Sequence, residues 1–330
     1  MIMKPLVLLS CMPAIDPKDP LWIKLHKVAQ VKIHSQNTNL KKTLSQNRFL
    51  SKAKGVVTLL TDVVDSFFLD QAPGLQVISN HAVGVNNIDV HEATKRHIAV
   101  CNTPDVLTNA TAEYTIAMMF AVARRFKEGY EMVAARAFKG WDPKLLLGTE
   151  LSGARLGIVG MGRIGKEVAK KAKALGMEVS YFSPHGENHL QYSKLSFHQL
   201  LKTSDFISIH CPLTLQTKGL FNRQVFECLK KGAFLINTAR GEIVDERALL
   251  GALSQKRLAG AALDVFCNEP NLNEALRKHG KIFVLPHLGS ATKNARVNMA
   301  RLAISGVLSV LCGRTPQNQV NCFSKAFKVM

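Results

Sequence analysis

Short apolar runs alternate with polar, helix-compatible segments along the first hundred residues. The runs lie at Leu6–Leu9, Val56–Leu60, Val77–Ser79 and Ile98–Cys101. Each run has the length of a buried strand, and the segments between the runs leave room for helices. This alternation predicts parallel strands joined by helical crossovers.

One long helix is expected from Asn109 to about Arg136. Apolar residues recur there at helical spacing, at Ala112, Ile116, Met119 and Ala123, and the segment contains no proline. Its methionine and aromatic side chains are interpreted as core residues. The sequence Trp141-Asp142-Pro143 then ends the helix and leads through a loop to Gly153.

A second series of strands begins after this loop. Strands are expected at Leu156–Val159, Glu178–Phe182, Phe206–Ile209, Phe234–Ile236, Ala261–Val265 and Ile282–Leu285. A last helix is expected at about Thr292–Leu311, and Gly313 suits its end. The whole pattern predicts an α/β fold with Rossmann-like, doubly wound parallel sheets and right-handed crossovers.

The composition fits a globular chain with more than one domain. The chain has 330 residues, of which 47% are hydrophobic, and this excludes a disordered or fibrous protein. No apolar run reaches the roughly 18 residues that a membrane-spanning helix needs, so no membrane association is expected. The brief apolar run after Lys4 is interpreted as a first strand rather than a signal peptide.

Seven cysteines are dispersed along the chain without a C-x-x-C pair or a Cys/His cluster. Such dispersion indicates neither a zinc site nor a disulfide framework, so no metal is expected. The cysteines are interpreted as small hydrophobic residues in a reducing compartment, and the expected location is the cytoplasm.

The formal net charge of +19 suggests nucleic acid as a partner, but the basic residues are scattered. They stand in short groups such as Lys41-Lys42, Lys170-Lys171 and Lys230-Lys231, without interleaved aromatic residues. We therefore disfavour nucleic acid and interpret the charge as a solvated surface that attracts anionic ligands.

A glycine motif, Gly160-Met161-Gly162-Arg163-Ile164-Gly165, follows a predicted strand and opens a predicted helix. In that context Gly160 permits a tight turn, Gly162 lets a pyrophosphate approach the backbone, and Gly165 allows close packing of helix on strand. The helix N-terminus supplies N–H donors to phosphates. Ile164 lies in the same turn, and Arg163 is either close to the phosphates or a solvated helix residue. The motif predicts a dinucleotide site.

Polar residues follow three further strands at their carboxyl ends, where ligands of open α/β sheets bind. The segments begin at Thr238, Asp264 and Pro286, and they bring Arg240, Glu269 and His287 toward one edge of the sheet. This trio suits reduction of a 2-oxo acid. Arg240 would grip the carboxylate and polarise the carbonyl.

In the same reaction His287 would donate the proton, and Glu269 would orient the ring and favour the imidazolium. Each residue also has an ordinary structural interpretation. Arg240 could be a turn residue, Glu269 a surface charge before Pro270, and His287 a satisfied buried histidine. The convergence of the three favours the catalytic interpretation.

These residues, together with the glycine motif, resemble the D-isomer-specific 2-hydroxyacid dehydrogenases over about Val77 to Gly313. The further motifs that carry the resemblance are Asn80-His81-Ala82-Val83-Gly84-Val85-Asn86-Asn87-Ile88-Asp89, Asn102-Thr103-Pro104-Asp105-Val106-Leu107-Thr108, Asn237-Thr238-Ala239-Arg240-Gly241 and Leu263-Asp264-Val265. The resemblance implies substrate-binding, tuning and proton-transfer roles for Arg240, Glu269 and His287.

The resemblance also implies further site residues. Val83 and Gly84 would offer backbone N–H groups to the substrate carboxylate, with Ser290 beside the substrate. Asp264 would hold the nicotinamide carboxamide, with Thr108 and Thr238 beside the cofactor.

The architecture implied by the resemblance has two domains. A nucleotide-binding Rossmann domain, residues 103–289, is inserted into a flavodoxin-like substrate domain formed by residues 1–102 and 290–330.

Within the family, the segments Pro286–Thr292 and Trp141–Gly148 look most like those of glyoxylate and hydroxypyruvate reductases. A small 2-oxo acid is thus the implied substrate, and a homodimer the implied assembly. In those enzymes a tryptophan like Trp141 reaches the neighbouring subunit's site, although a hydrophobic loop anchor is an equal alternative here.

Two other functions stay open. One is a D-3-phosphoglycerate dehydrogenase, or another D-2-hydroxyacid dehydrogenase. The second, from a different class, is a nucleotide-sensing transcriptional corepressor, since corepressors of this fold keep the same three residues. Fold alone cannot decide between them.

The expected cofactor is NADPH in preference to NADH. About twenty residues past the glycines, Ser183 stands where NAD-selective relatives place an acid. Ser183 can donate a hydrogen bond to a 2′-phosphate, and His185 could add partial positive charge. The alternative is that both residues merely shape a turn around Pro184, and the arginine that NADP-using relatives often carry after the serine is absent.

Overall fold

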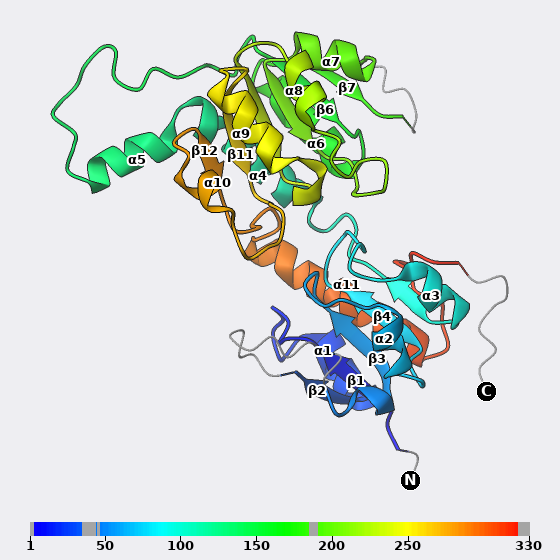
Figure 1. Cartoon of the computed structure of the whole chain (residues 1–330). Coiled ribbons are helices and arrows are strands. Elements are labelled where there is room, and N and C mark those ends of the chain that lie inside the picture. The colour runs from blue at the N-terminus through cyan, green and yellow to red at the C-terminus, as the bar shows by residue number, and fades with distance from the viewer. Residues whose placement is uncertain (1–2, 35–43, 45–46, 185–190, 323–330) are drawn as a thin grey trace. The chain divides into compact units, whose positions relative to one another are not determined.

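The computed structural model of the chain describes residues 3–34, 44, 47–184 and 191–322. The chain divides into two compact units. One consists of Met1–Leu107 together with Ala291–Met330, and the other of Thr108–Ser290. We call them the first unit and the second unit (Figure 1).

The first unit is built on a five-stranded parallel sheet with the strand order β2-β1-β3-β4-β5. The strands are β1 (Leu6–Leu9), β2 (Gln30–Ile33), β3 (Ala53–Thr58), β4 (Val77–Asn80) and β5 (Ala99–Cys101). The helices are α1 (Pro20–Val28), α2 (Ser66–Asp70), α3 (Val90–Lys95) and α11 (Lys293–Leu311), with a short 3-10 helix η2 (Leu50–Lys52). This strand order is the flavodoxin-like one.

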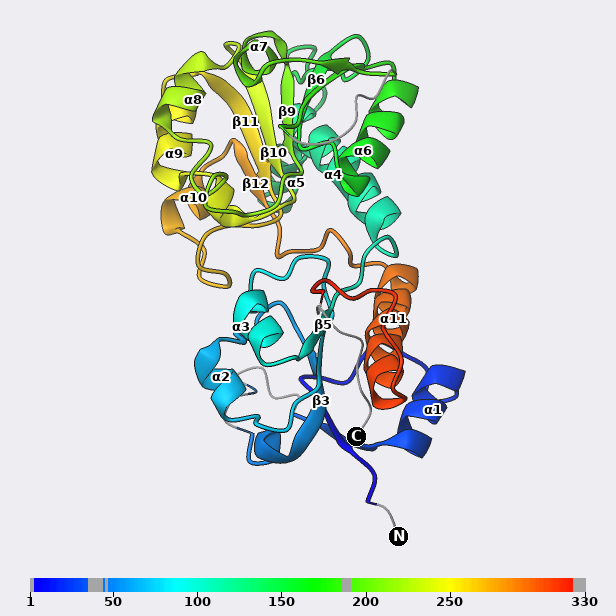
Figure 2. The ribbon, with the colours of Figure 1, turned by 90° about the vertical axis from the view of Figure 1, so that its right-hand side faces the viewer.

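Helices cover both faces of this sheet. Figure 2 shows α2 and α3 on one side and α1 and α11 on the other. Successive strand residues point to opposite faces, so Leu8 joins the layer under α2 and α3, while Leu9 joins the layer under α1 and α11. The sheet is therefore buried on both faces, as parallel sheets require.

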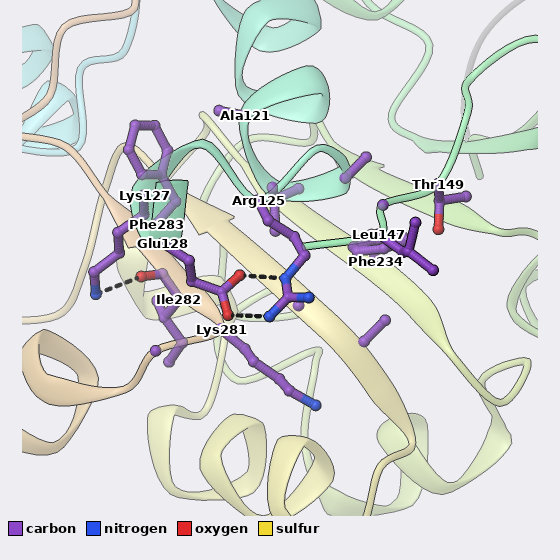
Figure 3. A pocket seen from close by; sticks show the side chains of 16 residues that line it. Ala121, Arg125, Lys127, Glu128, Leu147, Thr149, Phe234, Lys281, Ile282 and Phe283 are labelled. Atoms are coloured by element: carbon purple, nitrogen blue, oxygen red, sulfur yellow. Dashed lines mark hydrogen bonds and ion pairs between the residues drawn. The ribbon is translucent and has the colours of Figure 1, made fainter. Parts of the chain in front are cut away.

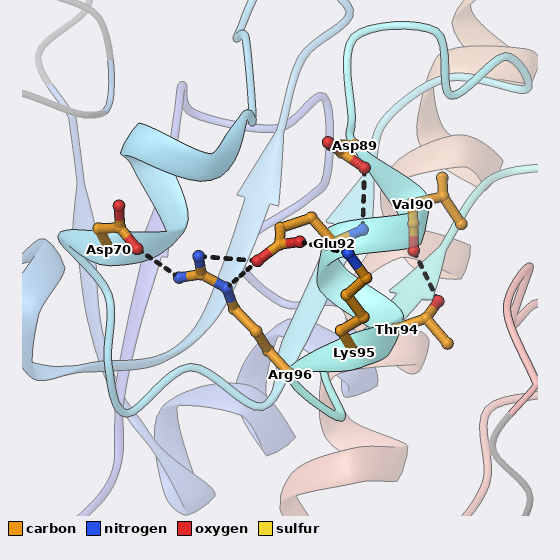
Figure 4. A network of polar contacts seen from close by, with 7 residues as sticks. All are labelled: Asp70, Asp89, Val90, Glu92, Thr94, Lys95 and Arg96. Carbon is orange, nitrogen blue, oxygen red and sulfur yellow. Dashed lines mark hydrogen bonds and ion pairs between the residues drawn. The ribbon is translucent and has the colours of Figure 1, made fainter.

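Polar contacts join two short helices on the surface of the first unit (Figure 4). Asp89 caps α3 by accepting the N–H of Glu92 at 2.8 Å. Arg96 pairs with Asp70 of α2 at 2.8 Å and with Glu92 at 2.9 Å. Because these side chains are partly exposed to solvent, the pairs order the surface more than they stabilise the fold.

The second unit is built on a seven-stranded parallel sheet with the order β12-β11-β10-β9-β6-β7-β8. The strands are β6 (Arg155–Val159), β7 (Glu178–Phe182), β8 (Ser193–Lys194), β9 (Phe206–Ile209), β10 (Ala233–Asn237), β11 (Leu258–Leu263) and β12 (Ile282–Val284). The order reverses between β6 and β9, which is the switch point of a doubly wound fold.

Helices flank this second sheet too. They are α4 (Thr108–Ala123), α5 (Phe126–Ala134), α6 (Arg163–Ala174), α7 (Phe197–Thr203), α8 (Arg223–Cys228), α9 (Glu246–Ser254) and α10 (Glu274–Lys278), with a 3-10 helix η3 (Gly241–Ile243). In Figure 2, α4 and α6 lie on one face, and α8 and α9 lie on the other. Ile158 and Val159 of β6 enter the two opposite apolar layers. Two parallel-sheet α/β units thus confirm the predicted fold class.

The prediction of one helix over 109–136 was wrong. The structure has two helices there, α4 and α5, because Arg125 between them adopts a left-handed backbone with φ of 55°. The Arg125 guanidinium also pairs with Glu128 in the first turn of α5. Burial changes at the same point, since α4 packs in the core whereas α5 buries none of its residues. The spacing of apolar residues does not reveal that a single residue, Arg125, adopts a left-handed backbone conformation and ends the helix.

Two strands, β2 and β8, were not predicted from the sequence, and each lies at an edge of its sheet. The residues of β2 are exposed or half-buried, and those of β8 are exposed. Neither carries the apolar run that marks a buried strand. Among the described residues, no helix is long and apolar enough to cross a membrane.

Candidate active site

The carboxyl ends of the parallel strands in the second unit meet at one edge of its sheet. The glycine motif follows β6, Ser183 follows β7, and His210 follows β9. Arg240 comes after β10, and Glu269 and His287 come after β11 and β12. The topology therefore gathers the predicted residues, and His210 with them, along a single edge.

Two glycines of the motif are required by close backbone contacts. Gly160 has φ of +100°, and a Cβ there would lie 2.5 Å from the backbone nitrogen of Cys211. A Cβ at Gly165 would collide with the carbonyl oxygen of Gly160. The turn after β6 thus folds tightly against the start of α6 and against the chain that follows β9.

Gly162 differs from the other two because its surroundings are open. A Cβ there would meet nothing within 4 Å. As the N-cap of α6, Gly162 offers no side chain to the first N–H groups of the helix, whereas Asp, Asn, Ser or Thr side chains cap α7, α8, α9 and α11. A helix N-terminus without a side-chain cap, beside open space, fits a pyrophosphate. Next to them, Arg163 is exposed and Ile164 packs on the core.

The end of β7 lies against the glycine turn, because the Gly160 N–H donates to the Phe182 carbonyl at 2.9 Å. Ser183 follows directly and is half-buried, and Pro184 is exposed. No carboxylate stands at either position. His185 lies outside the described residues.

His287 and Glu269 form a hydrogen-bonded pair. The distance from His287 Nδ1 to Glu269 Oε2 is 2.9 Å, and the side chains are 25% and 27% exposed. The other carboxylate oxygen, Oε1, accepts the Phe266 N–H at 3.2 Å. Because Nδ1 is engaged by the carboxylate, Nε2 is the ring nitrogen left for a substrate.

Asp264 holds the segment that carries His287. Its carboxylate accepts the N–H groups of Leu288 and Gly289 at 2.7 and 2.8 Å, and its carbonyl accepts the N–H of His287 at 2.8 Å. Burial raises the pKa of Asp264, while the backbone donors oppose that rise. The Tyr114 hydroxyl of α4 is also buried, and burial and the charge of Asp264 raise its pKa.

Arg240 is half-buried between β10 and η3. Burial lowers its pKa, and the charges of Glu269 and Glu242 oppose that shift. A Cβ at the next residue, Gly241, would collide with the backbone of Phe266. The loop of Arg240 and the loop of Glu269 therefore touch backbone to backbone.

The remaining predicted residues of the second unit are more dispersed. Thr238 lies 3.0 Å from Thr115 of α4 through their hydroxyl oxygens. Thr108 begins α4, and Ser290 ends the unit. Trp141 is 85% exposed, so it does not anchor its loop within the chain.

Val83 and Gly84 lie in the loop after β4 of the first unit. Asn102 Nδ2 donates to the Val83 carbonyl at 2.7 Å, and Asn80 Nδ2 donates to the Gly84 carbonyl at 2.8 Å. The backbone N–H groups of Val83 and Gly84 donate to no described residue. The loop is thus held by its carbonyls and presents its N–H groups, which suits a carboxylate.

His210 lies at the carboxyl edge of the second unit's sheet and Tyr114 lies beside Asp264, and neither was predicted from the sequence as a site residue. His210 is half-buried, and its Nε2 lies 2.7 Å from Ser208 Oγ. Burial lowers the pKa of His210 to about 3. A histidine that ends the apolar strand Phe206–Ile209 was a usable signal, whereas nothing in the sequence places Tyr114 beside Asp264.

A cavity of about 300 Å³ lies elsewhere in the second unit (Figure 3). Its walls include Phe234, Gly260 and Ile282, which stand at the beginnings of β10, β11 and β12. It is therefore at the opposite edge of the sheet from His287. Among the residues that the structure describes, no group of His, Cys, Asp or Glu could hold a metal ion.

The chain matches a known protein family in sequence. Residues 116–289 match the family model of the D-isomer specific 2-hydroxyacid dehydrogenase, NAD binding domain. The chain is 46% identical to a glyoxylate reductase of Thermococcus litoralis over 274 residues, covering 81% of this chain and 83% of that protein.

Two solved structures are similar as well. One, from Thermus thermophilus, is 39% identical with a TM-score of 0.88, covering 96% of this chain and all of the other. The second is an NADPH-dependent glyoxylate/hydroxypyruvate reductase of Sinorhizobium meliloti in complex with NADP and malonate. It is 26% identical with a TM-score of 0.87, covering 99% of this chain and all of the other.

The lowered pKa of His210 predicts an acid sensitivity of the fold. The pKa of His210 is about 3 in the folded chain and has its ordinary value of 6.5 in the unfolded chain. At a pH between these two values, the imidazole binds a proton in the unfolded chain but not in the folded chain. Unfolding then takes up a proton, so the free energy of unfolding falls as the pH falls. His210 contributes a slope of about 1.4 kcal/mol per pH unit. Urea unfolding of the parent and of His210→Gln at several pH values in this window should show a shallower slope for the variant. Equal slopes would contradict the assignment.

Proposed function

This chain belongs to the D-isomer specific 2-hydroxyacid dehydrogenase family, and on that premise we propose that it reduces a small 2-oxo acid, glyoxylate or hydroxypyruvate, to the D-2-hydroxy acid. The observation that carries the proposal is the pair of His287 Nδ1 and Glu269 Oε2 at 2.9 Å, on the edge of the sheet that also bears Arg240. The glyoxylate reductases among its relatives support the choice of substrate.

In the proposed reaction, His287 donates its Nε2 proton to the carbonyl oxygen of the substrate. The Glu269 carboxylate accepts a hydrogen bond from the Nδ1–H group, fixes the ring and stabilises the imidazolium before transfer. The Arg240 guanidinium binds the substrate carboxylate and polarises the carbonyl. A nicotinamide cofactor supplies the hydride when bound, held by the glycine motif, by the N-terminus of α6 and by Asp264.

The first unit is proposed to bind substrate. The Val83 and Gly84 N–H groups lack acceptors among the described residues, and a carboxylate would satisfy both. The cysteines are free thiols, which supports the cytoplasm as the location.

Replacing the proton donor tests the proposal directly. His287→Ala should lower kcat/KM for glyoxylate by about 10²- to 10⁴-fold, the usual worth of a positioned acid. His198→Ala, which removes an exposed histidine of α7, serves as the control and should retain the parent rate. A folded His287→Ala enzyme that matches the parent would remove His287 from the reaction.

A panel of 2-oxo acids separates the remaining candidates. Preference for 3-phosphohydroxypyruvate would indicate the phosphoglycerate dehydrogenase. A chain that binds a nicotinamide cofactor and turns over none of the acids would favour the corepressor.

NADPH is the proposed preferred cofactor. The end of β7 carries Ser183 and no acid, so a 2′-phosphate meets no like charge from this strand end. The Sinorhizobium meliloti relative, whose structure contains NADP, supports the proposal.

We expect kcat/KM with NADPH to exceed that with NADH by about tenfold or more, the worth of about 1.4 kcal/mol. Ser183→Asp should reverse the preference, because the new carboxylate repels the phosphate and accepts the ribose hydroxyls. Ser152→Asp adds the same charge before β6, at the other edge of the sheet, and should leave the preference unchanged. A parent enzyme that prefers NADH would contradict the proposal.

A homodimer is also proposed, with α5 and the loop after it in the interface. Phe126, Tyr130 and Val133 stand on one face of α5 and are 56%, 76% and 64% exposed. In the loop after α5, Trp141 and Leu147 are also exposed, by 85% and 67%. An exposed apolar surface of this kind is typical of an interface, and a second copy of the chain is the proposed partner.

Charging this surface should dissociate the dimer. Tyr130→Glu should convert the parent from a dimer to a monomer in light scattering at matched concentrations. Leu215→Glu charges a leucine that is 93% exposed and lies outside the surface, and it should remain dimeric. A monomeric parent, or a Tyr130→Glu variant that stays dimeric, would refute the interface.

A further inference from the structure

Glu246, the first residue of α9, contacts the loop that carries Glu269. Its Oε1 accepts the N–H of Cys267 at 2.8 Å, and its Oε2 accepts from Asn273 Nδ2 at 3.4 Å. Glu246 is half-buried. It thus joins the start of α9 to both ends of the segment Cys267–Asn273, with Glu269 between them.

Capping of its own helix does not explain Glu246. The preceding residue, Asp245, is the N-cap of α9 and accepts the N–H groups of Arg247 and Ala248. Glu246 forms no ion pair with a described residue. Its side-chain hydrogen bonds go to Cys267 and Asn273. The carboxylate therefore serves the loop and not the helix.

The backbone that Glu246 binds is joined directly to Glu269 and to the loop of Arg240. Glu269 Oε1 accepts the N–H of Phe266, the residue next to the one that Glu246 binds. Phe266 in turn touches Gly241, beside Arg240, backbone to backbone. A displacement of this backbone would move the acceptor of His287 Nδ1 and also the neighbour of Arg240.

We propose that Glu246 is a positioning residue of the reduction, whose hydrogen bond to the Cys267 N–H keeps Glu269 on Nδ1 of His287. The inference rests on the proposed function. Glu246 touches neither substrate nor cofactor in this assignment. It acts through the 266–269 backbone, and it fixes the orientation of the imidazole from which the proton leaves.

Three variants separate positioning from helix stability. Glu246→Ala removes the acceptor and should lower kcat for glyoxylate reduction about 10- to 100-fold, the scale expected for a small misplacement, with KM for the cofactor within about twofold of the parent. Glu246→Gln keeps an oxygen for the Cys267 N–H and should restore most of the rate. Asp245→Ala removes the cap of α9, so it should lower the Tm while kcat stays near that of the parent.

A double-mutant cycle shows whether Glu246 acts through Glu269. In a Glu269→Gln background, Glu246→Ala should change kcat by about twofold or less, because the group that it positions is already altered. Equal losses of kcat in both backgrounds would overturn the proposal. So would a Glu246→Gln variant as slow as Glu246→Ala.

A spectroscopic measurement keeps this test independent of turnover. The ring ¹⁵N–¹H signals of His287, assigned by their loss in His287→Gln, report the hydrogen bond at Nδ1 without substrate or cofactor. Glu246→Ala should shift them toward the positions seen in Glu269→Gln, and Glu246→Gln should leave them near those of the parent. Unshifted signals in Glu246→Ala would refute the positioning role. A parent that reduces no 2-oxo acid, with these shifts present, would refute only the proposed function.

Discussion

The buried carboxylate of Asp264 fixes the backbone on which His287 stands. Its two oxygens bind the N–H groups of Leu288 and Gly289, and its carbonyl binds the N–H of His287. A charged group with only 1% of its surface exposed is costly unless such donors satisfy it. The same bonds support the left-handed backbone of His287, whose φ of 56° a non-glycine residue adopts at a cost of about 1–3 kcal/mol.

From Asp264 the site extends through close contacts at glycines. Gly289 lies against Asp264 and Thr111 of α4, with a Cβ position 3.2 Å from Asp264 Oδ2. Gly241 brings the loop of Arg240 against Phe266, and Gly160 brings the glycine turn after β6 against Cys211. The side chains to which we assign roles in the reaction thus stand on loops that touch one another, and the parallel sheet holds those loops at one edge. Proximity and fixed orientation of this kind are what a proton transfer needs.

Much of this arrangement could be predicted from the sequence, because apolar runs mark buried strands and parallel strands share a carboxyl edge. The glycine motif, Arg240, Glu269 and His287 were all placed on that edge, and the structure pairs Glu269 with His287. The roles of these residues in turnover remain predictions. The break at Arg125 and the edge strands β2 and β8 were missed, since one depends on a single backbone angle and the others lack apolar runs.

The side-chain contacts between elements distant in the sequence were also beyond prediction. Tyr114 reaches Asp264 from a helix about 150 residues earlier, and Glu246 binds a loop that begins about twenty residues later. Such contacts follow from how α4 and α9 pack on the sheet, and pattern alone gives no packing register.

The stereochemistry of the product shows whether this chain transfers a hydride from a nicotinamide cofactor to a 2-oxo acid and forms the D-2-hydroxy acid. The parent enzyme would be incubated with hydroxypyruvate and a reduced nicotinamide cofactor that carries deuterium at the reactive position of C4. Product mass and configuration would then be determined by mass spectrometry and chiral chromatography. We expect D-glycerate with a single deuterium at C2. L-glycerate, a product without deuterium, or no reduction of any 2-oxo acid would refute the proposed reaction.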